Sequence, residues 1–398
     1  MRARVRQLAQ WASGVSVLPM LAMFRFLRRW LRVELCVVGV QRFGHLSLEP
    51  EVLLCLDQIQ REKSPSRTLR LWSFGRPRVQ SNQALVRMWR REVKHAPGRF
   101  VGALIRGGTL VPDLALPRTP LSVHGPANVL DRFESRLRRV ASEGGRTVLS
   151  RLGLNPETRY ACLAIRDGAY YQQSGTKESS GYSLLNFEAS QFVPAIEMLI
   201  DHGYFVIRMG TPTENVLPEM TGLLDYANSP LRSEPDDIEI IRNCAFVLST
   251  QTGIDALALA LRKPVLYIDT LRLSQFFLGT RLATWNPVKF IPRGSNLPLS
   301  LEPLFESRFM WMEDPDEFLT SGARFVRSSG EDVAKMVENY LQDLRGETPA
   351  ELKNLRISLN ERMTRILGNR GQQVWGNVTA SLNGWWLREN SEWFLSAK

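Results

Sequence analysis

The sequence has little cysteine and little histidine, and this scarcity argues against several classes of site. Each residue type occurs four times in 398 residues, and its copies lie far apart in the chain. No CxxC pair and no HExxH motif is present. A zinc enzyme is therefore not expected. Isolated cysteines inside apolar runs are typical of reduced core thiols in a cytosolic protein, not of a disulfide framework.

The sequence also lacks a long apolar run, internal repeats and low-complexity segments. The best candidate for a membrane span, residues 7–24, is interrupted by glutamine, serine, glycine and proline. It is too short and too polar for a transmembrane helix. Since no small-residue cleavage site followed by a mature sequence is evident, a signal peptide is not indicated either.

Positive charge, in contrast, is abundant. Lysine and arginine number 51 against 40 acidic residues, which gives a net charge of +11 and a pI of about 9.8. An anionic partner is expected, such as nucleic acid, lipid headgroups or a phosphorylated substrate. The 44% hydrophobic and 23% charged content is that of a globular protein, and the length suits two domains.

The N-terminal segment, residues 1–32, is basic and amphipathic. Arginines flank the stretch 7–24 and continue among Trp and Phe side chains in residues 25–32. This pattern suits a helix that lies on an anionic membrane surface. A basic helix packed on the protein itself explains it equally well, and the sequence leaves both interpretations open.

Strands and helices alternate through most of the chain, which predicts parallel sheets. The fold class is therefore α/β, with two Rossmann-like doubly wound domains facing a cleft and helical N- and C-terminal extensions. A cleft between two such domains would let a donor and an acceptor meet while water is excluded. The predicted domains are residues 33–150, residues 151–346 and a helical tail, residues 347–398.

In the first domain we predict strands at 33–40, 68–74 and 99–105, a helix starting near residue 48, and helices at 82–94 and 128–141. In the second domain we predict strands at 160–165, 204–209, 223–226, 245–248 and 264–268, and helices at 189–202, 236–243, 252–261 and 331–344. The tail ends in an aromatic cluster, Trp385, Trp386, Trp393 and Phe394. Doubly wound sheets bind ligands beyond the carboxyl ends of their strands.

The strongest local signal is the turn between the strand at 245–248 and the following helix. Hydroxyl groups and free backbone N–H groups converge there at a helix N-terminus, which favours a phosphate or another anion. Glycine in the turn would let a ligand approach the backbone closely. Simple helix capping is the alternative interpretation. The residues concerned are Ser249, Thr250, Thr252 and Gly253.

Arg166 and Asp167 follow the strand at 160–165 directly, and Arg208 and Gly210 stand at the end of the next strand. Two arginines at neighbouring strand ends can face one diphosphate. Asp167 could orient the ligand or act as a base. A surface Arg/Asp pair on a loop is the alternative.

His45 lies in the loop after the first predicted strand, together with Arg42. A histidine there could be the general base of a group transfer, because its ordinary pKa is near neutral. It could also simply bond a loop carbonyl. The sequence Asp314-Pro315-Asp316 has the outline of a D-x-D metal site, but its position before a helical stretch favours capping, so no metal site is predicted.

An ordered series of segments resembles a bacterial family of surface-polysaccharide glycosyltransferases with a GT-B-like organisation, over nearly the whole chain. The segments are VGVQRFGHLSLEPEVLL, LRLWSFGRPRVQSNQALVRMWRR, CLAIRDGAYY, NFEASQFVPAIEMLIDHGYFVIRMGTP, LLDYANSP, FVLSTQTGIDALALALRKPV and SLNGWWLRENSEWFL.

The chain is more distantly similar to fucosyltransferase-like enzymes, in which a strand-end H-x-R supplies the arginine that holds the sugar-nucleotide diphosphate. Arg166 matches that arginine, whereas Ala164 stands where the histidine would be. The resemblance also extends to the hydroxyl-rich turn at residues 249–252. It implies that the second domain holds a nucleotide sugar as co-substrate.

The expected function is thus a metal-independent glycosyltransferase, without a resident cofactor, that acts on a surface-polysaccharide or lipid-linked acceptor. The expected location is the cytoplasm, or the inner face of the plasma membrane as a peripheral protein. Alternatives are a nucleotide-sugar epimerase or hydrolase on the same fold, and a non-catalytic membrane-associated binding protein. Nucleic-acid binding would explain the charge but not the motifs.

Overall fold

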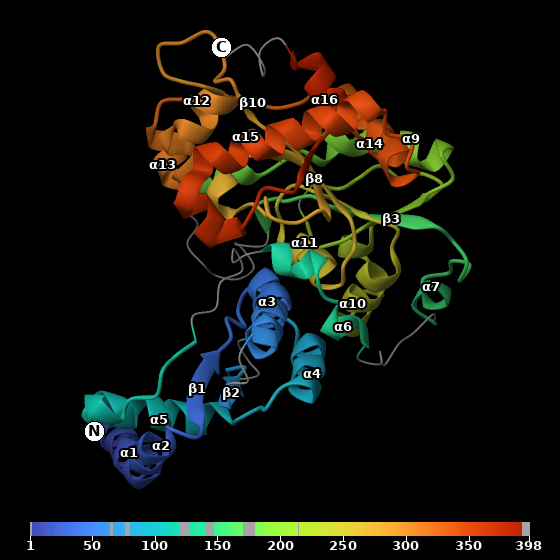
Figure 1. The fold of residues 1–398 in the computed structure, drawn as a ribbon. Helices are drawn as coiled ribbons and strands as arrows, with labels where there is room; N and C mark the ends of the chain where they lie inside the picture. The colour runs from blue at the N-terminus through green and yellow to red at the C-terminus, as the bar shows by residue number, and fades with distance from the viewer. Residues whose placement is uncertain are drawn as a thin grey trace. The chain divides into compact units, whose positions relative to one another are not determined.

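The computed structural model describes residues 2–63, 67–75, 80–119, 127–139, 147–169, 180–213 and 215–391, apart from the side chains of residues 2–6, 8, 9 and 147. The chain forms two compact units, Met1–Val123 and His124–Lys398 (Figure 1). Both are α/β in construction.

The first unit is organised around two parallel strands, β1 (Arg32–Val37) and β2 (Thr68–Ser73). Single parallel bridges extend the pair on both sides: Trp72 pairs with His95, and Leu35 pairs with Arg118. In chain order the four extended segments are arranged 3-2-1-4. This is the beginning of the Rossmann order 3-2-1-4-5-6, with its two outer members reduced to single bridges.

The predicted strand at 99–105 is wrong, because these residues belong to helix α5 (Gly98–Leu110). Val101, Leu104 and Gly107 recur every third residue and bury one face of the helix. This spacing is helical, since a strand would alternate every second residue. The third extended position of the sheet is instead taken by the segment around His95.

The strands of the first unit are followed by helices α3 (Phe43–Lys63) and α4 (Gln83–Glu92). Helix α3 starts about five residues earlier than predicted, so Pro50 lies inside it. A proline cannot donate to the carbonyl four residues before it. The indole Nε1–H of Trp89 on α4 donates to that carbonyl, of Leu46, at 2.8 Å.

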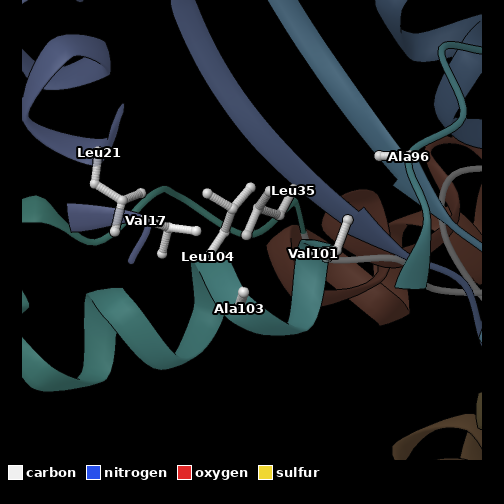
Figure 2. Packing of buried hydrophobic residues seen from close by; sticks show 7 residues of the cluster. All are labelled: Val17, Leu21, Leu35, Ala96, Val101, Ala103 and Leu104. Carbon is white, nitrogen blue, oxygen red and sulfur yellow. The ribbon is translucent and has the colours of Figure 1, made fainter. Parts of the chain in front are cut away.

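Helices α1 (Arg2–Val15) and α2 (Leu18–Leu27) pack on α5. Val17 and Leu21 meet Leu104 of α5 in a small apolar core, together with Leu35 of β1 (Figure 2). A Cβ atom added at Gly107 would lie only 2.8 Å from Leu21 Cδ1, so glycine permits the close approach of these helices.

The second unit contains a parallel seven-stranded sheet of order β11-β8-β7-β6-β3-β4-β5. Counted along the chain within this unit, the order is 3-2-1-4-5-6-7, which contains the doubly wound Rossmann arrangement and confirms the predicted fold class. The strands are β3 (Tyr160–Ala164), β4 (Phe205–Arg208), β5 (Leu223–Leu224), β6 (Val247–Ser249), β7 (Val265–Thr270), β8 (Ala283–Pro287) and β11 (Ser381–Leu382). A separate antiparallel pair is formed by β9 (Lys289–Ile291) and β10 (Arg324–Val326).

The principal helices of the second unit are α9 (Val193–Asp201), α10 (Glu234–Asn243), α11 (Gly253–Ala260), α13 (Pro315–Thr320), α14 (Gly330–Leu344), α15 (Ala350–Trp375) and α16 (Gly384–Glu389). Of these, α9, α10, α11 and α14 are close to the four predicted ranges, and α15 and α16 lie in the predicted helical tail. In place of one helix at 128–141, the described residues form a 3-10 turn, Ala127–Asp131, and a short helix, α6 (Arg136–Arg139). The Asp131 carboxylate accepts hydrogen bonds from the Thr280 hydroxyl and the Arg281 N–H, which ties this turn to the start of β8.

The ends of the second unit differ from the predicted domain limits. Residues 124–150, assigned to the first domain from sequence, belong to this unit. The tail is part of it as well, because β11 is the seventh strand of the sheet and Trp386 is buried. Trp393 and Phe394 of the predicted aromatic cluster lie outside the described residues.

Candidate functional site

The strand order of the second unit identifies where a ligand would bind. In a doubly wound sheet the crevice opens at the carboxyl ends of the strands where the order reverses, here between β3 and β6. Ala164 and Ser249 are paired neighbours at these ends. Both segments singled out from the sequence, residues 166–167 and 249–253, therefore begin at this switch point.

Arg166 and Thr250 join the two strand ends directly. The Arg166 N–H donates to Thr250 Oγ1 at 2.9 Å, and the Thr250 N–H donates to the Ala164 carbonyl at 3.2 Å. The Arg166 side chain is half-buried, and its Cζ lies 5.6 Å from the ring centroid of Tyr182. A half-buried guanidinium thus lies beside Tyr182, just beyond the carboxyl end of β3.

The turn after β6 has a strained backbone and is hydrogen-bonded to the loop after β7. Gln251 has a φ of 59°, which is unusual for a residue other than glycine. Its side-chain oxygen accepts from the Leu271 N–H at 3.2 Å, and its Nε2 donates to the Arg272 carbonyl at 3.2 Å. No sequence pattern predicts this role for Gln251, because its hydrogen-bond partners lie in the loop after β7.

The capping interpretation of residues 249–253 is confirmed. Thr252 caps α11 by accepting from the Ile254 N–H, and Asp255 completes a capping box by accepting from the Thr252 N–H at 2.7 Å. Ser249 is fully buried and donates its hydroxyl to Asp255 Oδ2 at 2.8 Å, so it bonds inward. Gly253 is the first residue of the helix.

Asp255 is a buried acid directly behind the helix N-terminus, and sequence reasoning missed it. Burial raises its pKa from 3.8 to about 7, although hydrogen bonds from Ser249 and from the backbone oppose the shift. A T-x-x-D spacing at the start of an apolar helix is the signal that could have identified it.

Arg208 lies at the end of β4 as expected, but its surroundings differ from the expectation. It is fully buried, and Nη1 donates to Asp225 Oδ2 at 3.3 Å and to the Asn215 carbonyl at 2.5 Å. Its Nη2 lies 3.9 Å from Asp167 Oδ2. The side chain therefore lies fully buried between two carboxylates, with no exposed surface.

Asp167 and Gly210 follow the ends of β3 and β4, close to Arg208. Asp167 is buried, and its Oδ1 accepts from the Ala169 N–H at 3.2 Å. Gly210 has a φ of 141°, a conformation that side chains with a Cβ rarely adopt. The chain can therefore turn sharply just beyond Arg208.

Asp269 forms a further buried cluster at the carboxyl end of β7 that the sequence did not reveal. It accepts from Asn286 Nδ2 at 2.7 Å, and from the N–H and hydroxyl of Ser328, both at 2.8 Å. Burial raises its pKa, against these donors. The neighbouring Arg327 packs with its Cζ 3.7 Å from the ring centroid of Phe187, two residues before η5 (Ala189–Phe192).

In the first unit, His45 lies in the first turn of α3 and not in the preceding loop. Its partner is a carboxylate and not a loop carbonyl: Nδ1 lies 2.7 Å from Glu49 Oε1. The His45 side chain is 32% exposed and that of Glu49 only 6%. A buried acid that fixes one ring nitrogen orients the imidazole and leaves Nε2 as the basic atom. Glu49 was missed, although its i, i+4 spacing from His45 is a readable signal.

Asp314 caps α13 as predicted, since its Oδ1 accepts from the Asp316 N–H at 3.0 Å. Asp316 in turn accepts from the Gly181 N–H at 2.7 Å. Among the residues that the structure describes, no group of three or more His, Cys, Asp or Glu side chains is placed to hold a metal ion.

No family model and no curated protein matches the chain. Among solved structures, it is similar to the iron-containing dodecameric glycosyltransferase TibC from enterotoxigenic E. coli H10407, at 14% identity and a TM-score of 0.31. That match covers 62% of this chain and 60% of TibC, so the chain spans about three fifths of its length.

Two further structures are similar at the same level. A glycosyl transferase family 9 protein from Veillonella parvula shows 13% identity and a TM-score of 0.32, over 59% of this chain and 79% of that one. E. coli heptosyltransferase WaaC with ADP shows 14% identity and a TM-score of 0.30, over 59% and 87%.

Proposed function

We propose that the protein is a glycosyltransferase that transfers a sugar from a nucleotide-sugar donor to a saccharide or lipid-linked acceptor. The observation that carries the proposal is the juxtaposition at the β3/β6 switch point. There Arg166 and the N-terminus of α11 stand together at the carboxyl edge of a sheet of Rossmann order.

The chemistry required is the stabilisation of a leaving nucleoside diphosphate. Its negative charge grows as the glycosidic bond breaks, and fixed cations and N–H donors stabilise such charge most in a partly desolvated crevice. Arg166 would bind the diphosphate through its planar fork. The N-terminal dipole of α11, with Thr252 and Gly253, would contribute further.

Arg208 would support this site indirectly. Because it balances Asp167 and Asp225, two carboxylates beside the crevice would not repel the diphosphate. Removing one of these partners would leave a charge uncompensated, which typically costs about 3–5 kcal/mol. Arg208 is therefore assigned to supporting the crevice and not to contacting the donor.

His45 is the preferred candidate for the base that accepts the acceptor's hydroxyl proton. Its pairing with Glu49 is the arrangement that holds an imidazole in one tautomer and stabilises the cation formed when it takes a proton. Asp167 is the other candidate, and its Oδ2 lies 3.9 Å from Arg208 Nη2.

In this proposal an arginine and backbone dipoles stabilise the negative charge of the diphosphate, so we expect turnover without a divalent metal ion. The resemblance of the sequence to surface-polysaccharide glycosyltransferases supports a surface-polysaccharide acceptor. The basic N-terminal segment favours peripheral association with an anionic membrane. Turnover in excess chelator would be equal to turnover with added Mg²⁺. A strict requirement for the ion would contradict the expectation.

A release assay tests the proposed reaction. Nucleoside diphosphate would be measured from candidate nucleotide sugars with and without a lipid-linked saccharide acceptor. The proposal expects release that depends on the acceptor. Acceptor-independent consumption would instead indicate an epimerase or hydrolase, and binding without consumption under any condition would indicate a non-catalytic protein.

A further inference from the structure

Large apolar side chains are exposed along the two N-terminal helices. Trp11 on α1 is 59% exposed, Met23 and Phe26 on α2 are 48% and 73% exposed, and Trp30 just beyond α2 is 60% exposed. Pro19, Met23, Phe26 and Trp30 recur at helical spacing. The rings of Phe26 and Trp30 lie with centroids 6.0 Å apart. On α2 and in the turn after it, these side chains form one stripe, not scattered single residues.

The stripe is exposed because the opposite side of α2 is already used in packing. Val17 and Leu21 are buried against α5 in the core that Figure 2 shows. Residues 19, 23, 26 and 30 are offset from residues 17 and 21 by about half a helical turn. The intramolecular core therefore does not satisfy the exposed stripe.

Charge around the stripe has one sign. Residues 1–33 contain seven arginines, at positions 2, 4, 6, 25, 28, 29 and 32, and the first acidic residue of the chain is Glu34. Arg28 and Arg29 are exposed beside Phe26 and Trp30. A second copy of the chain docked face to face would set arginines against arginines, which is unfavourable.

We propose that this aromatic stripe, Met23, Phe26 and Trp30 with the flanking Arg28 and Arg29, is a membrane-docking surface for anionic phospholipid. Aromatic and aliphatic side chains would enter the headgroup region, and the arginines would pair with lipid phosphates. Among the described residues, no helix has the length and apolarity needed to cross a bilayer. The surface is proposed to lie on the membrane.

The proposed membrane surface uses residues of the first unit alone. It rests on the proposed function only for its consequence, access to a lipid-linked acceptor. A protein held on the bilayer would meet a lipid-linked acceptor in two dimensions, whereas its donor would arrive from solution. Lipid binding and nucleotide binding are measured separately, so failure of one leaves the other unaffected.

The test is co-sedimentation of the full-length chain with vesicles. Binding is compared between phosphatidylcholine alone and phosphatidylcholine with about one third phosphatidylglycerol. We expect the wild-type chain to bind the anionic vesicles and to release them at high salt. Equal binding to both vesicles, or binding to neither, would overturn the proposal.

Two pairs of variants separate charge from apolar insertion. Arg28→Gln with Arg29→Gln should weaken anionic-vesicle binding roughly thirty-fold, because each arginine near the surface contributes to attraction. Arg90→Gln with Arg91→Gln, an adjacent exposed pair on α4, is the charge-matched control and should leave binding unchanged. If both pairs of substitutions weakened vesicle binding equally, binding would depend on net charge alone and the assigned surface would be wrong.

Phe26→Ser with Trp30→Ser should also abolish vesicle binding, and Leu297→Ser with Ile357→Ser, at exposed positions of the second unit, should not. Unchanged thermal unfolding of each variant confirms that it is folded. Light scattering in the absence of lipid tests for self-association. If the wild type were a dimer that Phe26→Ser with Trp30→Ser converted to a monomer, the stripe would be a self-association surface and the proposal would fail.

Discussion

Arg166 is the residue on which the proposed donor binding would depend most directly, because its backbone N–H is hydrogen-bonded to Thr250 at the switch point. We predict that Arg166→Ala weakens the binding of nucleoside diphosphates by about ten- to a hundred-fold, the usual range for a lost charged hydrogen bond. Titration calorimetry measures this loss.

Arg159→Ala is the matched control for that variant. Arg159 is exposed just before the amino end of the same strand, where its Cζ packs 4.3 Å from the ring centroid of Tyr204. Donor affinity in this variant should equal that of the wild type. If both variants bound equally, whether tightly or weakly, Arg166 would not be the specific contact.

The His45–Glu49 pair makes a kinetic prediction. His45→Ala should lower kcat by about 10²–10⁴-fold, as the loss of a general base does, while leaving donor affinity unchanged. Glu49→Gln keeps a hydrogen-bond acceptor but loses the charge, and should lower kcat by about tenfold or more. His202→Ala, at an exposed position of the second unit, should have no effect. A parallel loss of donor affinity in the His45 variant would argue against the role of base.

Residue types at strand ends could be predicted from sequence, but their side-chain directions could not. Arg166 and Arg208 follow neighbouring strands and look equivalent in the sequence, yet only Arg208 is fully buried between carboxylates. Its partner Asp225 lies seventeen residues further along the chain. Only the fold brings such pairs together.

Helix α11 carries a buried acid, and this makes a pH prediction at the scale of the element. The pKa of Asp255 is raised from 3.8 to about 7 in the folded chain. Between these values the folded state holds a proton that the unfolded state has lost. The contribution of Asp255 to the free energy of unfolding therefore falls as pH rises from about 4 to about 7, by at most about 4 kcal/mol, and is constant above that window.

Asp255→Asn isolates this effect, because an amide can accept the same hydrogen bonds without titrating. Urea unfolding of both proteins between about pH 4 and pH 8 gives the difference in stability, wild type minus variant. We expect that difference to decrease across the window. A difference that stayed constant, or that increased with pH, would show that Asp255 is ionised throughout.

Elements with a clear period or a clear cap were predicted well, and elements defined by distant contacts were not. The turn and helix at 249–261 follow from an apolar strand that meets a capping threonine. In contrast, the segment 99–105 is short and apolar, and the sequence of such a segment does not show whether it forms a strand or a helix. The packing of α1 and α2 on it decides for the helix. Strand β11 has two residues and exists only through its pairing with β8.

At the scale of the whole chain, alternation of strands and helices was enough to predict two parallel α/β units. It could not give the strand order, because pairing between β3 and β6 joins residues more than eighty positions apart. That order is what makes the switch point a site, and it turned two separate sequence signals into neighbours. The resemblance of the sequence supplied the sugar in the proposed donor.

The central claim is that the carboxyl edge of the seven-stranded sheet binds a nucleotide sugar. A thermal-shift screen of the full chain against a panel of adenosine, uridine, guanosine and cytidine diphosphate sugars tests it most directly. At a hundred times Kd, a ligand that binds only the folded state stabilises it by about 2.7 kcal/mol, which raises Tm by several degrees. We expect at least one of them to raise Tm and Arg166→Ala to abolish the shift. No shift with any nucleotide sugar, or a shift that Arg166→Ala leaves intact, would contradict it.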